Sequence, residues 1–166
     1  MNQMGEMLMD ICEVIIIRPF NSEDRALVSA FFDQMGGETR AFFNRGDGNR
    51  RTAMKFFEGG QDNTARFLAE ACGRMVGYVF LWDMDRSVPW LGIAVAEDWK
   101  GRHLGRRLLE HAHAYARAHG KGGVLLTTGF ANVRGQGLYE RMGYEHIGTH
   151  TIGEKLYIRR FGGEES

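Results

Sequence analysis

The chain has 166 residues, of which 43% are hydrophobic and 25% are charged, and this is the composition of an ordinary soluble globular protein. Its 21 basic and 21 acidic residues cancel, which disfavours a protein whose main partner is the phosphate backbone of nucleic acids. No stretch approaches the ~18 consecutive apolar residues of a membrane-spanning helix, and two cysteines are too few for a disulfide framework or a zinc cluster.

We expect a cytoplasmic protein with reduced cysteines and a single structural domain, because no linker separates the sequence into halves. The expected division is a mobile segment over residues 1–12 and one domain over residues 13–166. The first ten residues lack the basic start and the apolar core of a signal peptide. Cys72 is interpreted as a small, buried hydrophobic residue.

The first part of the sequence predicts one strand followed by three helices. A β-branched run over residues 14–17 predicts the strand. We expect Asn21 or Ser22 to cap the next helix, with Glu23 and Asp24 in its first turn, where acidic side chains are favoured. Two shorter helices are expected over residues 38–44 and 50–58.

The remainder of the sequence alternates strands with two further helices. Leucine and alanine recur at helical spacing over residues 103–119, which makes this the clearest helix of the chain. A shorter helix is expected over residues 133–142. The strands are expected over residues 65–72, 75–82, 90–96, 124–128, 144–149 and 155–161. This mixed order predicts an α+β (α/β) fold with a partly antiparallel sheet.

The most informative segment is a strand that leads through a loop rich in glycine and basic residues into the long helix. The loop reads Lys-Gly-Arg-His-Leu-Gly over residues 100–105. Unpaired N–H groups and the positive end of the helix dipole bind anions at such a helix start, and glycine lets a ligand approach the backbone. We therefore predict a phosphate-binding turn, whose spacing fits neither a Walker A loop nor a Rossmann fingerprint.

The same residues resemble the acyl-CoA-binding signature of the GNAT (GCN5-related) N-acetyltransferase superfamily, Arg/Gln-x-x-Gly-x-Gly/Ala. Lys100 stands where arginine or glutamine is usual, and His103 stands where glycine is usual. Further along, Asn132 and, seven positions later, Tyr139 within Leu-Tyr-Glu-Arg-Met-Gly-Tyr are similar to a second motif of this family. The resemblance extends from about residue 65 to residue 149.

The resemblance implies the GNAT acyl-CoA N-acyltransferase fold, a mixed, mostly antiparallel sheet of about six to seven strands flanked by helices. It also implies direct transfer of an acetyl group from acetyl-CoA to a primary amine of a small molecule, a peptide or a protein. We expect no metal, no nucleic acid and no membrane partner, and a homodimer is compatible with the family.

The resemblance also implies roles for particular residues. The pantetheine arm is expected to add to the strand at Ile93, Ala94 and Val95, and Asn132 is expected to contact the same arm. Tyr139 is expected to give a proton or a hydrogen bond to the departing CoA thiolate, since a tyrosine pKa near ~10 keeps the hydroxyl protonated at neutral pH. The residues expected to hold the pyrophosphate are Lys100, Gly101, Arg102, His103, Leu104, Gly105 and Arg106.

The sequence does not identify a general base, because the strand over residues 90–96 contains no carboxylate. A water relay, Glu38, Glu70 and Asp83 remain alternatives. The phenylalanine pairs at 31–32, 42–43 and 56–57 are interpreted as core residues, with the alternative that some of them cover an acceptor pocket. Trp82 and Trp90 are a further candidate wall for a cationic acceptor.

Two other functions remain open at this stage. The missing strand carboxylate and His103 are compatible with a non-catalytic module that binds acyl-CoA and regulates a partner. The basic turn is also compatible with a nucleotide-binding or nucleic-acid-associated domain. A metal site is disfavoured, because no two histidines of the long helix have the i, i+4 spacing that would place both on one helix face.

Overall fold

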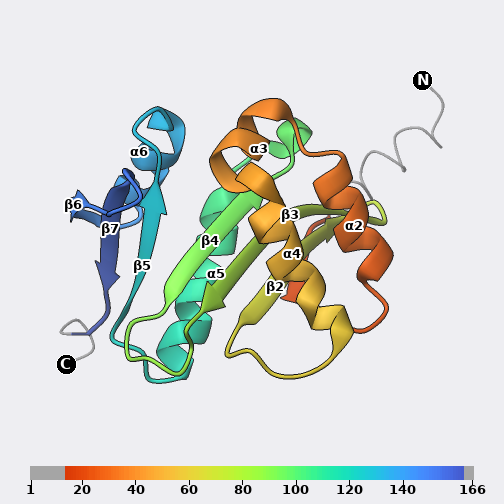
Figure 1. Cartoon of the computed structure of the whole chain (residues 1–166), viewed down its shortest axis with the longest axis horizontal. Helices are drawn as coiled ribbons and strands as arrows, with labels where there is room; N and C mark the ends of the chain where they lie inside the picture. The colour runs from red at the N-terminus through yellow and green to blue at the C-terminus, as the bar shows by residue number, and fades with distance from the viewer. Residues whose placement is uncertain (1–13, 163–166) are drawn as a thin grey trace.

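The computed structural model describes residues 14–162, so the expected mobile segment over residues 1–12 lies outside the described residues. Seven strands form one sheet in the order β1-β2-β3-β4-β5-β7-β6, in which β4 and β5 are parallel and all other neighbours are antiparallel (Figure 1). The strands are β1 (Ile16–Pro19), β2 (Ala65–Ala71), β3 (Arg74–Trp82), β4 (Trp90–Val95), β5 (Gly123–Thr128), β6 (Glu145–Thr149) and β7 (Lys155–Arg160). The predicted fold class, a mixed and mostly antiparallel sheet flanked by helices, is confirmed.

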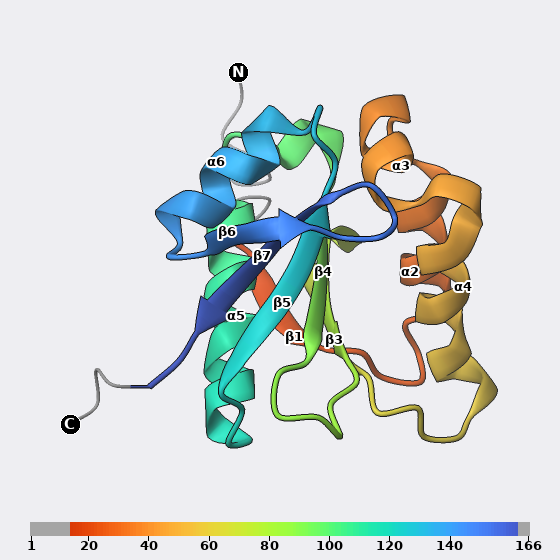
Figure 2. The ribbon, with the colours of Figure 1, turned by 60° about the vertical axis from the view of Figure 1, so that its left-hand side comes forward.

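Helices cover both faces of the sheet (Figure 2). On one face lie α2 (Arg25–Asp33), α3 (Gly37–Phe43) and α4 (Gly48–Met54), and on the other lie α5 (Leu104–Ala118) and α6 (Val133–Arg141). The single helix expected over residues 50–58 is in fact two elements. The α-helix α4 ends at Met54, and a 3-10 turn follows over Lys55–Glu58. Among the described residues, no helix has the length and apolar character needed to cross a bilayer.

Two layers of apolar side chains hold the helices on the sheet, and β3 contributes to both. Tyr78 and Phe80 pack on the side of α2 and α4, whereas Val79 and Leu81 pack on the side of α5. Burial on both faces explains why β3 reads as a nearly continuous hydrophobic run rather than as an alternating one. A Cβ at Gly77 would lie 2.8 Å from Leu108 Cδ1, so this glycine lets α5 approach the sheet closely.

The start of α2 differs from the prediction. The helix begins after Asp24, and neither Asn21 nor Ser22 caps it. The Asp24 carboxylate instead accepts hydrogen bonds from Arg18 at 2.7 and 2.8 Å and from the Asn21 amide at 2.7 Å. The hydrogen bond from Arg18 holds the pKa of this buried carboxyl below its usual range. The acidic residue therefore ties the helix to β1.

Cys72 also differs from the prediction. It is exposed in the turn between β2 and β3, with a φ of +56°, and it is disulfide-bonded. The expectation of a buried, reduced cysteine is therefore wrong at this position. Cys72 and Gly73 together form the turn of the hairpin between β2 and β3, and both have the positive φ that such a tight turn requires.

Candidate active site

The parallel strands β4 and β5 diverge after a single point of contact. They pair through Trp90 and Leu125, although β4 continues to Val95 and β5 to Thr128 (Figure 1). The amide of Ala96 donates to Val76 on β3 at 2.9 Å. Along an antiparallel strand, every second residue directs its backbone N–H and C=O groups toward the partner strand. Because Ala96 bonds to β3, the backbone groups of Ile93 and Val95 point away from β3, toward the gap between β4 and β5. An extended ligand can therefore pair with these two residues, and Ala94 contributes only its side chain.

The loop before α5 exposes a row of backbone amides. Gly101 and His103 both have left-handed backbone conformations, with φ of +77° and +63°. The first hydrogen bond within the helix runs from the amide of Arg107 to the carbonyl of His103, at 3.2 Å. The amides of Gly105 and Arg106 precede this bond, so they have no acceptor inside the helix and, with the helix dipole, favour an anion here.

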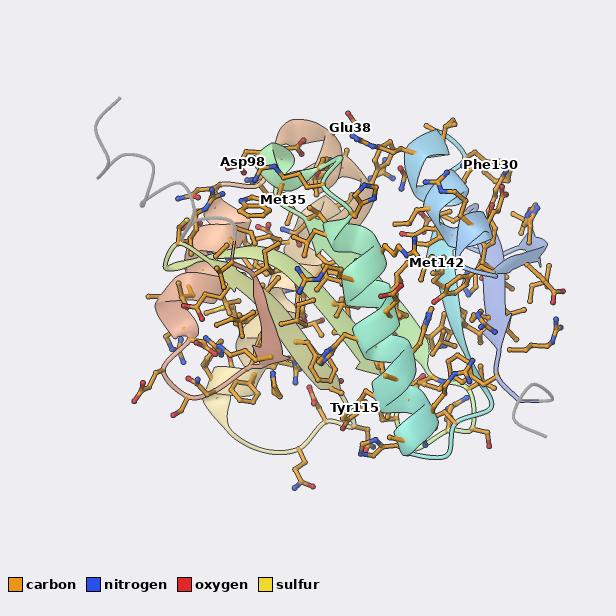
Figure 3. All side chains as sticks on the ribbon, turned by 180° about the vertical axis from the view of Figure 1, so that it is seen from behind. Met35, Glu38, Asp98, Tyr115, Phe130 and Met142 are labelled. Atoms are coloured by element: carbon orange, nitrogen blue, oxygen red, sulfur yellow. The ribbon has the colours of Figure 1, made fainter. Side chains whose placement is uncertain are left out.

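The predicted site residues meet at one cavity of about 650 Å³ between α3, α5 and α6. All of them line this cavity except Arg102, whose guanidinium lies 4.6 Å from the ring centroid of Trp99. In Figure 3, the cavity residues Glu38 and Met142 lie toward the N-terminal end of α5, and Tyr115 lies at its opposite end. The structure thus brings together eleven of the twelve residues expected at the site, with Arg102 on the outside.

Lys100 connects the loop to α3. Its Nζ donates to Thr39 Oγ1 at 2.6 Å and to Glu97 Oε1 at 3.2 Å, and Thr39 also donates to Glu97. The hydrogen bond from Thr39, followed by the interactions with Lys100, lowers the pKa of Glu97. This network fixes α3 as a wall of the cavity and keeps the ammonium group of Lys100 at its edge.

Two arginines of α6 add positive charge that the sequence interpretation missed. Arg134 and Arg141 line the cavity beside Lys100 and Arg106, and Glu38 is the acidic residue that faces them. Their seven-residue spacing, with Leu138 between them, places them on one face of α6. This spacing was the available signal, but only the packing of α6 against α5 shows which face lines the cavity. The excess of cations suits the phosphates of a coenzyme A molecule.

Tyr139 lies where this cavity meets a second one. Its side chain is 8% exposed and lines both cavities. Burial raises the pKa of Tyr139 to about 12, and the negative charge of Glu154 and the neighbouring Tyr157 add to this shift. The hydroxyl therefore remains protonated at neutral pH and can donate. Among the residues that the structure describes, none hydrogen-bonds to it.

Asn132 positions the helix that carries Tyr139. Its Oδ1 accepts from the amide of Gly135 at 3.1 Å, which caps α6, and its Nδ2 donates to Thr128 Oγ1 at 3.0 Å. A Cβ at Gly135 would lie 2.5 Å from Asn132 Nδ2, so the cap requires glycine there. Asn132 also lines both cavities, but its amide already has protein partners on each side.

The second cavity has a volume of about 630 Å³ and shares Tyr139, Phe42 and Phe43 with the first. Of the candidate bases, Glu70 pairs with Arg18 at the far edge of the sheet, Asp83 lies in the turn after β3, and neither lines the first or the second cavity. Glu38 lines the first cavity, which is the cavity suited to coenzyme A.

The acidic residue of the second cavity is Glu154, which the sequence interpretation missed. Trp82 lines this cavity as one alternative suggested, whereas Trp90 does not.

Phe31 and Phe32 are core residues, and Phe56 packs against Phe20 with their ring centroids 5.6 Å apart. Only the phenylalanine pair at 42–43 therefore faces the cavities. Within residues 14–162, no group of three or more metal-ligating side chains gathers.

The left-handed conformation of His103 explains why glycine is usual at this position of the signature. A side chain in this conformation costs about 1 kcal/mol relative to glycine. We expect His103→Gly to raise the free energy of unfolding by about 1 kcal/mol, measured by denaturant titration. His119→Gly is the comparison variant: φ there is −98°, so glycine relieves no strain, and loss of the contact between His119 Nδ1 and the Tyr115 carbonyl at 2.8 Å should lower stability. A His103→Gly protein that is less stable than the unchanged protein would contradict the claim that the left-handed conformation of His103 costs stability.

Comparisons with known proteins agree with this geometry. Residues 62–146, just over half of the chain, match the family model described as an acetyltransferase (GNAT) domain. The GNAT domain of PAT from S. lividans has a TM-score of 0.77 at 16% identity, covering 87% of this chain and 89% of that one. An acetyltransferase of the GNAT family from Streptococcus pneumoniae has a TM-score of 0.71 at 22% identity, covering 89% of this chain and 100% of that one.

A third similar structure was solved with a ligand. The PaiA N-acetyltransferase from Thermoplasma acidophilum, in complex with coenzyme A, has a TM-score of 0.71 at 14% identity, covering 89% of this chain and 99% of that one. A comparison with curated protein sequences finds no match. The fold is that of the acyl-CoA N-acyltransferases, and the chain belongs to the GNAT family of acetyltransferases.

Proposed function

We propose that this protein transfers an acetyl group from acetyl-CoA directly to a primary amine of a small molecule, a peptide or a protein. The observation that carries the proposal is the position of Tyr139, whose side chain is shared by the cavity suited to coenzyme A and by a second cavity. An acyl donor in the first cavity and an acceptor in the second would meet at this hydroxyl, with no covalent enzyme intermediate and no metal.

The residues of the first cavity suit each part of the donor. The amides of Gly105 and Arg106, with the nearby cations, would hold the pyrophosphate. The free backbone groups of Ile93 and Val95 would pair with the two amides of the pantetheine arm, as an added strand does. Both interactions point the thioester toward Tyr139, which would donate its hydroxyl proton to the leaving sulfur.

The alternative is a module that binds acyl-CoA without turnover, favoured by the absence of a carboxylate on β4. The experiment that separates the two is an assay of thiol release from acetyl-CoA over a panel of amines. The panel contains an arylalkylamine, a polyamine, an amino acid and peptides with a free N-terminus or lysine. We expect release with at least one of them above the rate without amine. Binding of acetyl-CoA with no release over the whole panel would support the alternative.

A further inference from the structure

Aromatic side chains form much of the wall of the second cavity, beside polar residues such as Asn49 and Thr128. Aromatic rings from α3, from β3 and from the loop after β5 line it, together with the apolar side chains of Leu91 and Ile152. These rings belong to Phe42, Phe43, Phe80, Trp82 and Phe130. Phe130, labelled in Figure 3, stands beside α6 at the end of the molecule where both cavities lie. Such a lining suits an acceptor with an apolar or aromatic body.

Within these walls stands one carboxylate. Among the described residues, Glu154 is the only acidic side chain that lines this cavity, and the exposed Arg45 is the only basic one. A Cβ at Gly129 would lie 3.7 Å from Glu154 Oε2 and 3.9 Å from Phe42 Cδ1. The carboxylate and the aromatic wall therefore lie over the same glycine, at the end of β5.

One side-chain contact and two backbone hydrogen bonds fix the position of Glu154. Thr127 Oγ1 donates to Glu154 Oε1 at 3.2 Å. The backbone carbonyl of Glu154 accepts from the amide of His150 at 2.8 Å, and the amide of Gly153 donates to the carbonyl of His150 at 2.8 Å. A closed turn thus holds Glu154 just before β7, and its Oε2 has no hydrogen-bond or ion-pair partner within residues 14–162.

We propose that Glu154 receives the ammonium group of the acceptor and takes its proton, so that the acceptor is a primary monoamine carried on an apolar or aromatic body. This inference rests on the proposed function, which it makes more specific. A half-buried carboxylate without a cationic partner attracts a cation, and aromatic faces nearby add to the attraction. A single carboxylate matches a single positive charge, whereas a polyamine would leave further charges against aromatic walls.

The proton balance of this step is complete. The ammonium gives one proton to the Glu154 carboxylate, which later releases it to water, and the neutral nitrogen then forms a bond to the acetyl carbon. The carbon–sulfur bond breaks, and the sulfur receives the hydroxyl proton of Tyr139. The second proton leaving the nitrogen restores that hydroxyl. The sum is ammonium plus thioester giving amide, free thiol and one proton. The influence of Glu154 on the pKa of Tyr139 supports the closeness of the two groups.

The test compares Glu154→Gln with the unchanged protein, using phenethylamine and spermidine as acceptors. We expect phenethylamine to have a kcat/KM at least tenfold above that of spermidine. Glu154→Gln is expected to lower kcat/KM for phenethylamine about 100-fold at pH 7, and less at pH 9.5, where more of the amine is already neutral. Acetyl-CoA affinity should not change, since Glu154 does not line the first cavity. Glu140→Gln is the matched control, because this carboxylate binds Tyr157 outside both cavities.

A second readout separates this inference from the proposed function. Phenethylamine, added with CoA, should raise the Tm of the unchanged protein and of Glu140→Gln but not that of Glu154→Gln. This result without any turnover would support the ammonium site and overturn the proposed transfer. Preferred acetylation of spermidine or of a peptide lysine would overturn the inference and leave the transfer intact. Equal kcat/KM in Glu154→Gln and the unchanged protein would also overturn it.

Discussion

Replacing Tyr139 by phenylalanine is expected to lower kcat about 100-fold at neutral pH without weakening acetyl-CoA binding. The change removes one hydroxyl from a buried ring and leaves the packing of α6 in place. Because burial raises the pKa of Tyr139 to about 12, the hydroxyl of the unchanged protein stays protonated from pH 6 to pH 9. The loss in kcat should therefore be constant over this range. Steady-state kinetics across it, with a calorimetric acetyl-CoA titration, measure both quantities.

The control for this variant is Tyr144→Phe. Tyr144 is also a buried tyrosine, and its hydroxyl lies 2.6 Å from His113 Nε2, but it lines neither cavity. We expect this change to cost about 1 kcal/mol of stability and to leave kcat unchanged. Full kcat in Tyr139→Phe from pH 6 to pH 9 would exclude the role of Tyr139 as the acid.

Gly105→Glu is expected to weaken acetyl-CoA binding by more than about 100-fold, because steric blocking of the cavity and repulsion between negative charges act together. A Cβ at this position would already lie 3.0 Å from Leu138 Cδ2, so a longer side chain must enter the cavity between α5 and α6. The added carboxylate would also place a negative charge at the helix start, where the pyrophosphate is expected. The dissociation constant from calorimetry measures the effect.

Arg107→Glu is the matched control for Gly105→Glu. Arg107 lies in the same turn of α5, is exposed and lines neither cavity. This variant changes the net charge by two units, whereas Gly105→Glu changes it by one. If the net charge of the protein governed acetyl-CoA affinity, Arg107→Glu would bind acetyl-CoA more weakly than Gly105→Glu. We expect it to bind within about threefold of the unchanged protein, because surface charges are screened by salt.

The sequence was sufficient for most of the elements and for the residues that line the first cavity, because local patterns determine both. Apolar runs and helical spacing of apolar residues mark most of the strands and helices, and Gly101 in the loop at residues 100–105 has the left-handed conformation that favours glycine. His103 was identified as a departure from the family signature. Its left-handed conformation gives the physical reason, which no spacing rule contains.

The second cavity could not be predicted, because it depends on pairing between distant strands. Thr128 on β5 pairs with Lys155 on β7, and this register carries Glu154 over Gly129. A shift of one residue would turn the side chain of Glu154 to the other face of the sheet. Nothing in the local sequence of either strand specifies this register. The proposed bases Glu70 and Asp83 were selected by residue type alone, and their elements lead away from the cavities.

The most direct test of the account is a calorimetric titration with acetyl-CoA, run beside CoA and ATP. Two separate interactions are proposed in the first cavity: the pyrophosphate binds the start of α5, and the pantetheine arm pairs with the free edge of β4. ATP can make only the first of these. We predict a dissociation constant in the micromolar range for acetyl-CoA and for CoA, and binding of ATP at least tenfold weaker. No heat with either coenzyme, or equal affinity for ATP, would contradict the assignment of this cavity to an acyl-CoA donor.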